Sequence, residues 1–165
     1  MVGVSVKVNI EDAQRTLSEA QEALENPISM WDEIGVAMTQ STTDRFATGT
    51  TPDGNQWPQS IRVKMAQGNG QTLVDKGQLV RSITHEANDG GVEIGTNVIY
   101  AAIHQFGGTI RAKTAKGLRF SIPGVGFVNV QAVNIPARPF LGVNAEDENE
   151  IGEIALRHVA QAFGG

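Results

Sequence analysis

The order of hydrophobic and polar positions near the N-terminus changes from a period of two to a helical period. Val4, Val6 and Val8 alternate with polar residues, which is typical of a short strand. Apolar residues then recur at spacings of three and four, which predicts an amphipathic helix ending near Asn26. The apolar positions of this helix are Ile10, Ala13, Leu17, Ala20 and Leu24.

A second helix is expected to follow directly. Pro27 suits a first helical turn because its missing N–H is not needed there. An apolar stripe then runs to Gly49, where the helix should end. The stripe consists of Ile28, Trp31, Ile34, Met38 and Phe46. The pattern therefore predicts two N-terminal helices in series.

A long exposed connection is expected over residues 50–72. Residues that favour turns gather in it: Pro52, Asp53, Gly54, Pro58, Gly68 and Gly70. Loops of this length usually carry a function or lack fixed structure. Within this one, the Asp53-Gly54 turn is expected to direct Trp57 into the core.

Strand patterns dominate the middle of the chain. A short helix after Gly77 leads to residues 83–87 and 92–95, which flank a turn and predict a hairpin. Residues 118–122 and 127–135 predict a second, longer hairpin. Residues 109–117 between the two are expected to form an exposed basic arm.

The C-terminal segment predicts one more helix. Pro136 and Pro139 interrupt any strand, and an acidic run then falls at the positive end of the helix dipole. The order helices, strands, helix favours an α+β fold with an antiparallel sheet built from hairpins. Two N-terminal helices and one C-terminal helix would pack on that sheet, in a single domain over residues 1–165.

Composition narrows the possible classes of protein. The chain has 165 residues, 40% of them hydrophobic, and no cysteine, so disulfides and thiolate metal sites are excluded. No apolar run approaches the roughly 20 residues of a membrane helix, and the first residues lack the pattern of a signal peptide. We therefore expect a protein that is made in the cytoplasm and does not enter a membrane.

The charge of −5 is unevenly distributed along the chain. No Asp or Glu occurs between Thr96 and Ala145, and five basic residues do: Arg111, Lys113, Lys116, Arg119 and Arg138. The rest of the chain carries eight basic and eighteen acidic residues, a balance of −10. A basic region and acidic termini suit head-to-tail contacts between copies, which can close into a ring. A solvated basic loop explains the pattern equally well.

Candidate catalytic and metal-binding residues are few. His85, His104 and His158 lack the spacing of a zinc protease, so we expect structural histidines and no metal. Asp75 and His104 could be combined with a serine as a triad, but no serine stands in a nucleophile elbow. Glycine pairs lack the lysine of a phosphate loop. The sequence thus predicts neither an enzyme nor a bound cofactor.

Contact with nucleic acid is the main alternative suggested by the residues. Arg111, Lys113, Lys116 and Arg119 lie among small residues, as in arms that follow phosphates. Phe120 is the one aromatic nearby, whereas single-strand binding uses several aromatics for stacking. The remaining possibility is loose, non-specific contact with the backbone of duplex DNA.

Several ordered segments resemble the phage virion morphogenesis family, whose members include tail-completion proteins. The segments are Phe46, residues 51–58, residues 73–79 with Ser82-Ile83, Gly95-Thr96, Tyr100-Ala101, residues 103–108 and residues 135–142. The motif residues within them are Asp53, Gly54, Trp57, Asp75, Gly77, Tyr100, Phe106, Gly107, Pro139 and Phe140. The order and the separations of these segments together make the resemblance specific.

This resemblance implies a late structural role in a phage or prophage particle. The protein would complete the tail or join tail to head, as a ring of several copies that also contacts tail or neck proteins. It would be made in the bacterial cytoplasm and reside in the tail or neck of the virion.

The motif residues also have local interpretations. Asp75 could cap the short helix that follows Gly77. Arg138, between two prolines, is suited to pair with a carboxylate, either within the subunit or on a neighbour. Phe140 and Leu141 are expected in the core, and residues 104–108 at the end of a packed element followed by a tight turn.

Overall fold

The computed structural model describes residue 18 and residues 27–65, 70–122 and 124–163. The predicted strand at residues 4–8 and helix at residues 10–26 lie outside this part of the chain, apart from Ser18. The α+β class is confirmed. In chain order the described elements are α2 (Ile28–Thr48), α3 (Ile61–Met65), α4 (Gln78–Arg81), β1 (Thr84–Asn88), β2 (Gly91–Gly95), α5 (Ala101–Phe106), β3 (Gly108–Arg111), β4 (Leu118–Ile122), β5 (Gly126–Val130), β6 (Ala132–Ile135) and α6 (Ala145–Ala162).

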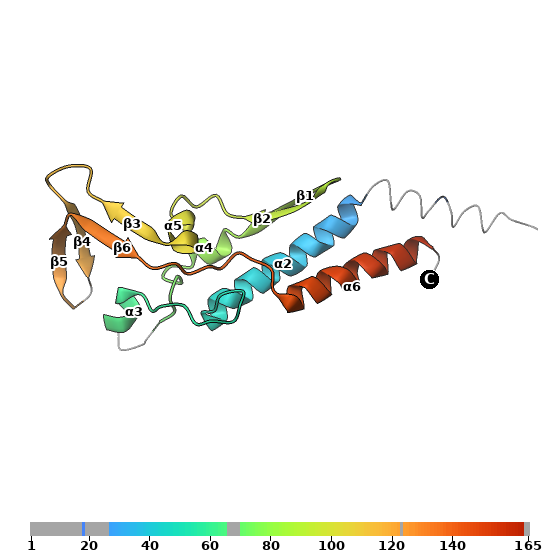
Figure 1. Cartoon of the computed structure of the whole chain (residues 1–165), viewed down its shortest axis with the longest axis horizontal. Helices are drawn as coiled ribbons and strands as arrows, with labels where there is room; N and C mark the ends of the chain where they lie inside the picture. The colour runs from blue at the N-terminus through green and yellow to red at the C-terminus, as the bar shows by residue number, and fades with distance from the viewer. Residues whose placement is uncertain (1–17, 19–26, 66–69, 123, 164–165) are drawn as a thin grey trace, which may run out of the picture.

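The helices α2 and α6 lie side by side and form one half of an elongated molecule (Figure 1). As predicted, α2 begins after Pro27 and ends at Gly49. Gly49 adopts the left-handed conformation with φ 73°, and its N–H donates to the carbonyl of Arg45 over 2.8 Å, as in a glycine C-cap. The start of the predicted second helix and its end are both confirmed.

The start of α6 is stabilised by a capping box. The Asn144 side chain accepts from the Asp147 N–H, and the Asp147 carboxylate accepts from the Asn144 N–H. Glu146, Asp147 and Glu148 occupy the first turn, where the helix dipole favours negative charge. The acidic run therefore marks the helix start, as the sequence predicts.

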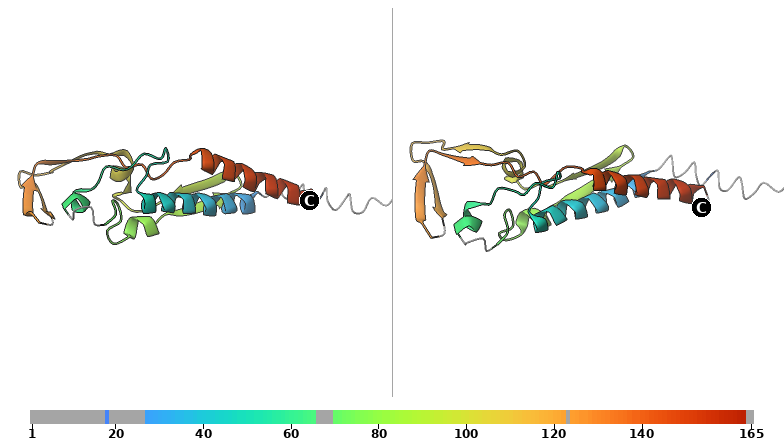
Figure 2. Two further views of the ribbon diagram at one scale, coloured as in Figure 1. Left: turned by 90° about the horizontal axis from the view of Figure 1, so that it is seen from below. Right: turned by 60° about the horizontal axis from the view of Figure 1, so that its bottom comes forward.

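The strands form three separate antiparallel pairs in the described part of the chain, where the sequence predicts hairpins of one sheet. The β1–β2 hairpin packs on α2 and matches the first predicted hairpin. β4 pairs with β5, as predicted, while β6 pairs with β3 instead of extending β5. The pairs β3–β6 and β4–β5 project away from α2 and α6 (Figures 1 and 2).

Two sequence predictions in this region are wrong. Residues 127–135 are not one strand, because the chain changes strand partner at Gln131. Apolar residues lie at 128 and 130 but then at 133 and 135, so the alternation shifts by one residue at this break. Residues 109–117 are not wholly a loop, because β3 covers Gly108–Arg111 and is paired with β6.

In the described part of the chain, the core consists of two clusters of buried side chains. In the first, the Phe46 ring lies 5.4 Å from that of Trp57 and 5.2 Å from that of Phe140, centroid to centroid. In the second, Ile34 and Met38 of α2 meet Ile154 of α6. The first cluster joins the 50–72 connection to the body, so that connection is only partly exposed: it contains α3 and the buried Trp57.

Among the helices described, none has both the length and the hydrophobicity that a bilayer crossing requires.

Candidate functional site

Residues 108–122 and 124–135 form a projection that we call the β-arm. It consists of the β3–β6 ribbon, the β4–β5 hairpin and the segment 112–117 that joins them. The arm occupies the end of the molecule away from α2 and α6, and the β4–β5 hairpin turns sharply from the β3–β6 ribbon (Figures 1 and 2).

The β-arm has no hydrophobic core. None of its described residues is buried, although each ribbon has an apolar face. Ile110 stands opposite Val133 on one ribbon, and Phe120 stands opposite Val128 on the other. Phe127, on the opposite face of β5, is 82% exposed. Two-stranded ribbons are marginally stable in water when nothing covers them, so the arm offers apolar surface that a partner could cover.

All charged residues of the β-arm are basic. Arg111 lies on β3, Lys113 and Lys116 in the joining segment, and Arg119 on β4, and all four side chains are exposed. None of them forms an ion pair with another residue of the described chain. The structure thus brings together four of the five basic residues that the sequence predicts as contact residues.

The fifth, Arg138, lies in the body and is only 5% exposed. Its guanidinium donates to the carbonyl of Pro58 over 2.7 Å and to that of Gln59 over 3.4 Å. Burial lowers the pKa of Arg138. Of the two alternatives for a carboxylate partner, the one within the subunit is not found among the described residues: Arg138 fastens the 50–72 connection through main-chain carbonyls.

Most motif residues of the 50–60 region and of the last loop have local roles. Gly54 closes a turn in which its N–H donates to the Thr51 carbonyl over 2.9 Å. Trp57 then reaches the core and donates from Nε1 to the Pro139 carbonyl over 2.9 Å. Phe140 is fully buried, as predicted. The Asp53-Gly54 turn and Pro139-Phe140 are therefore parts of one packed unit.

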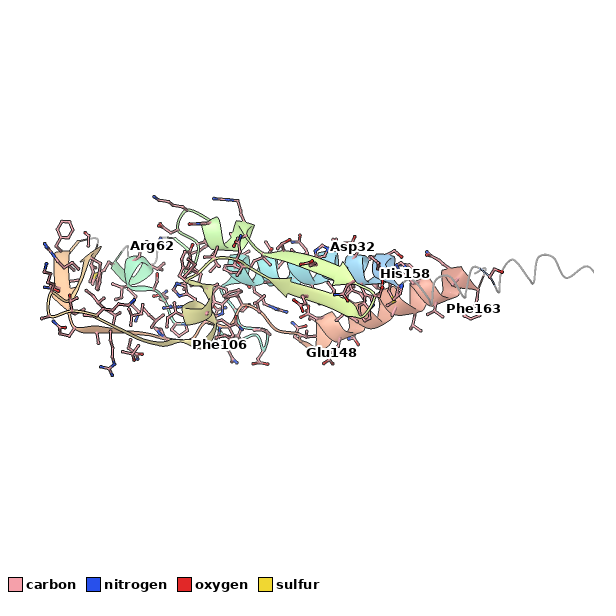
Figure 3. All side chains as sticks on the ribbon, turned by 90° about the horizontal axis from the view of Figure 1, so that it is seen from above. Asp32, Arg62, Phe106, Glu148, His158 and Phe163 are labelled. Atoms are coloured by element: carbon pink, nitrogen blue, oxygen red, sulfur yellow. The ribbon has the colours of Figure 1, made fainter. Side chains whose placement is uncertain are left out.

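The remaining motif residues surround α4 and α5. Gly77 occupies the N-cap of α4 without any side-chain hydrogen bond, so the predicted capping by Asp75 is wrong; the Asp75 carboxylate lies 3.7 Å from Arg62 instead. Tyr100 precedes α5 and stacks edge-on with His104. Gly107 ends α5 with φ 69°, which makes the predicted turn, and Phe106 beside it is exposed (Figure 3).

The three histidines lie in different surroundings. His85 lies 3.0 Å from Asp32 and His158 lies 2.7 Å from Glu33, through their Nε2 atoms. His104 is half-buried, and its Nδ1 has no hydrogen-bond partner among the described residues. Burial is the main cause that lowers its pKa, and the charge of Arg138 lowers it further. In the described chain no three acidic or histidine side chains converge as metal ligands would.

A second surface, which the sequence analysis did not predict, is a cleft of about 1080 Å³ that we call the acidic groove. It lies between the C-terminal half of α2, the turn at residues 50–54 and the start of α6. Six acidic residues and one arginine line it: Asp44, Asp53, Glu146, Asp147, Glu148, Glu150 and Arg45. No local sequence pattern predicts this groove, because its acidic residues come from segments about a hundred positions apart.

The Arg45–Asp147 ion pair forms the floor of the groove. Both side chains are buried, and Arg45 also donates to the carbonyls of Phe140, over 3.1 Å, and Gly142, over 2.7 Å. Since this pair is internally neutral, the charge that the groove presents comes from the exposed carboxylates around it.

The comparison with known proteins supplies what the geometry alone does not. The model of the phage virion morphogenesis family matches residues 8–160. The chain belongs to this family. It therefore has a structural role in virion assembly, is associated with the virion and interacts with other virion proteins.

Two curated relatives agree with the family. The "Mu-like prophage FluMu G protein 2" of Haemophilus influenzae is 32% identical over 151 residues, which are 90% of this chain and 91% of the relative. The "Putative capsid assembly protein G" of Escherichia phage Mu is 29% identical over 137 residues, 79% of this chain and 78% of the relative. No solved structure gives a significant match.

Proposed function

We propose that the protein is a tail-completion or head–tail joining subunit that associates with copies of itself into a ring and contacts tail or neck proteins. The observation that carries this proposal is the β-arm, which has two apolar faces and four cations but no core. Apolar surface of this kind marks protein contacts when it is rimmed by polar residues. Family membership supports the assembly role on independent grounds.

The first test is the mass of the purified protein by light scattering over a range of protein and salt concentrations. We expect a species of several subunits that grows with protein concentration and weakens as salt rises, because exposed charges are screened within about 8 Å at physiological salt. A protein that stays monomeric at every concentration, alone and with isolated tails or heads, would contradict the proposal.

The second candidate function is contact with the backbone of duplex DNA, which the four exposed cations of the arm favour. The Lys113→Glu/Lys116→Glu variant would then bind duplex DNA more weakly at low salt. The slope of log affinity against log salt concentration would also become shallower by about two, since each phosphate contact contributes about 0.9 to that slope. The matched control is Lys64→Glu/Lys76→Glu, which makes the same charge change on exposed lysines outside the arm. Equal affinity for both variants would exclude this function for the arm.

A further inference from the structure

A partner that covers the β-arm should offer both apolar surface and negative charge. The apolar faces of the arm, which include Ile110 and Val133, need to be removed from water. Its four cations have no acidic neighbour within the arm, because residues 108–135 contain no Asp or Glu. A suitable partner surface is therefore concave, partly apolar and negatively charged.

The acidic groove has these properties. With six acidic residues and one arginine along its lining, its formal charge is −5, against +4 on the arm. Apolar surface is present as well: Val143 is 54% exposed, and Pro52 and Ala37 line the same cleft. The two surfaces match in charge and in chemical character, and such matching sets the orientation and the choice of partner in protein contacts.

The arm and the groove lie in different parts of one molecule. Glu148, at the start of α6, is well separated from the β4–β5 hairpin along the long axis (Figure 3), and both views in Figure 2 agree. An arm that projects away from its own body is placed to reach the groove of another copy.

We propose that the β-arm of one copy lies in the acidic groove of the next copy. This inference rests on the proposed self-association and specifies its contact. The contact joins two different patches, so it is heterologous: repeated, it produces a ring if the rotation between copies closes, and an open array if it does not. Duplex DNA is a poor occupant of the groove because the carboxylates repel phosphates.

Disulfide trapping tests the contact directly, because the natural chain contains no cysteine. One protein carries Lys116→Cys on the arm and a second carries Glu150→Cys in the groove; both positions are exposed. We expect a cross-linked dimer when the two are mixed and oxidised, with less product in high salt. The matched control pairs Lys116→Cys with Asp89→Cys, at the exposed tip of the β1–β2 hairpin. Equal yields in both mixtures, or no product in either, would overturn the proposal.

Exchange of charges provides a second test. Lys113→Glu/Lys116→Glu cancels the charge of the arm, from +4 to zero, and Glu148→Lys/Glu150→Lys reduces that of the groove from −5 to −1. We expect each variant alone to associate less than the natural protein and an equimolar mixture to associate more than either. In the mixture the unchanged arm of the groove variant can meet the unchanged groove of the arm variant, a contact that neither variant can form with itself. Asp53→Lys, outside the helix, replaces the α6 changes if circular dichroism shows that they unfold it.

The outcomes separate this inference from the proposed function. If the natural protein forms oligomers but the mixture is no better than its components, the arm–groove contact is wrong and self-association stands. If the natural protein never associates and no cross-link forms, both are wrong. If only the arm variant fails to associate and the groove variants behave normally, the arm contacts some other surface and the inference fails.

Discussion

At the scale of single residues, the structure gives the physical reason for several positions that the sequence singles out. Gly107 is one: a Cβ built there would lie 2.7 Å from the backbone nitrogen of Ala137, and its φ of 69° disfavours any other residue. The motif residue Trp57 and the predicted contact residue Arg138 are also explained by hydrogen bonds to the main chain at residues 139 and 58. Trp57 was predictable as a buried aromatic, whereas the carbonyl acceptors of Arg138 were not, because main-chain acceptors leave no mark in sequence.

Replacing Gly107 with alanine should destabilise the protein. The clash with the backbone and the positive φ together are expected to lower the free energy of unfolding by about 1–3 kcal/mol. Urea unfolding followed by circular dichroism measures the change. Gly152→Ala in α6 is the matched control: nothing lies within 4 Å of the added Cβ, so about 0.5–1 kcal/mol of stabilisation is expected. Equal effects at the two positions would contradict the structural account of Gly107.

His104 should titrate below its usual range. Burial and the nearby Arg138 charge lower its pKa from 6.5, so the unfolded chain binds a proton more readily than the folded one. Stability should therefore fall as the pH drops from about 6.5 toward the lowered pKa of the folded state. An NMR titration of the His104 ring measures this, and Arg138→Met should raise the value by removing the charge. A His104 pKa at or above 6.5 would contradict the geometry.

At the scale of elements, the limits of α2 and the start of α6 could be predicted because Pro27, Gly49 and the acidic run mark them locally. The hairpin β1–β2 was predictable for the same reason. The sequence prediction treated β5 and β6 as one strand and so missed that β5 pairs with β4 and β6 with β3. The shift of the apolar alternation at Gln131 indicates this break in the sequence itself. The acidic groove was not predictable, since it depends on how α2 and α6 pack.

The Arg45–Asp147 pair should contribute strongly to the packing of α2 against α6. Asp147→Ala leaves the buried Arg45 cation without its carboxylate and removes the capping box, so a loss of about 3–5 kcal/mol in unfolding free energy is expected. Chemical denaturation measures it. Glu148→Ala, one position along and exposed, is the control and should change stability by only about 0.5 kcal/mol. Similar losses of unfolding free energy in the Asp147→Ala and Glu148→Ala variants would show that the Arg45–Asp147 pair contributes little to stability.

At the scale of the whole molecule, stability should be distributed unevenly along the long axis. The body contains both clusters of buried residues, whereas the β-arm contributes none. Regions with few buried contacts open most readily and exchange their amide hydrogens fastest. The molecule is therefore expected to behave as a stable body with an arm that becomes ordered fully only in contact with a partner.

Hydrogen exchange followed by mass spectrometry tests this distribution. In the dilute protein, peptides from β3 to β6 should exchange before peptides from α2 and α6 do. At concentrations where subunits associate, protection should increase in the arm and at residues 144–150, and remain unchanged at the β1–β2 tip. An arm as protected as α2 in the dilute protein would show that it is stable without a partner.

The separation of charge along the molecule also affects how fast copies meet. A basic arm at one end of an acidic body makes each subunit an electric dipole. Approaching copies are then rotated toward head-to-tail alignment before they touch, and such steering raises association rates by about 10- to 1000-fold at low salt. Salt should therefore slow the encounter more than it speeds dissociation, which makes the ionic strength of the host cell a factor in the timing of assembly.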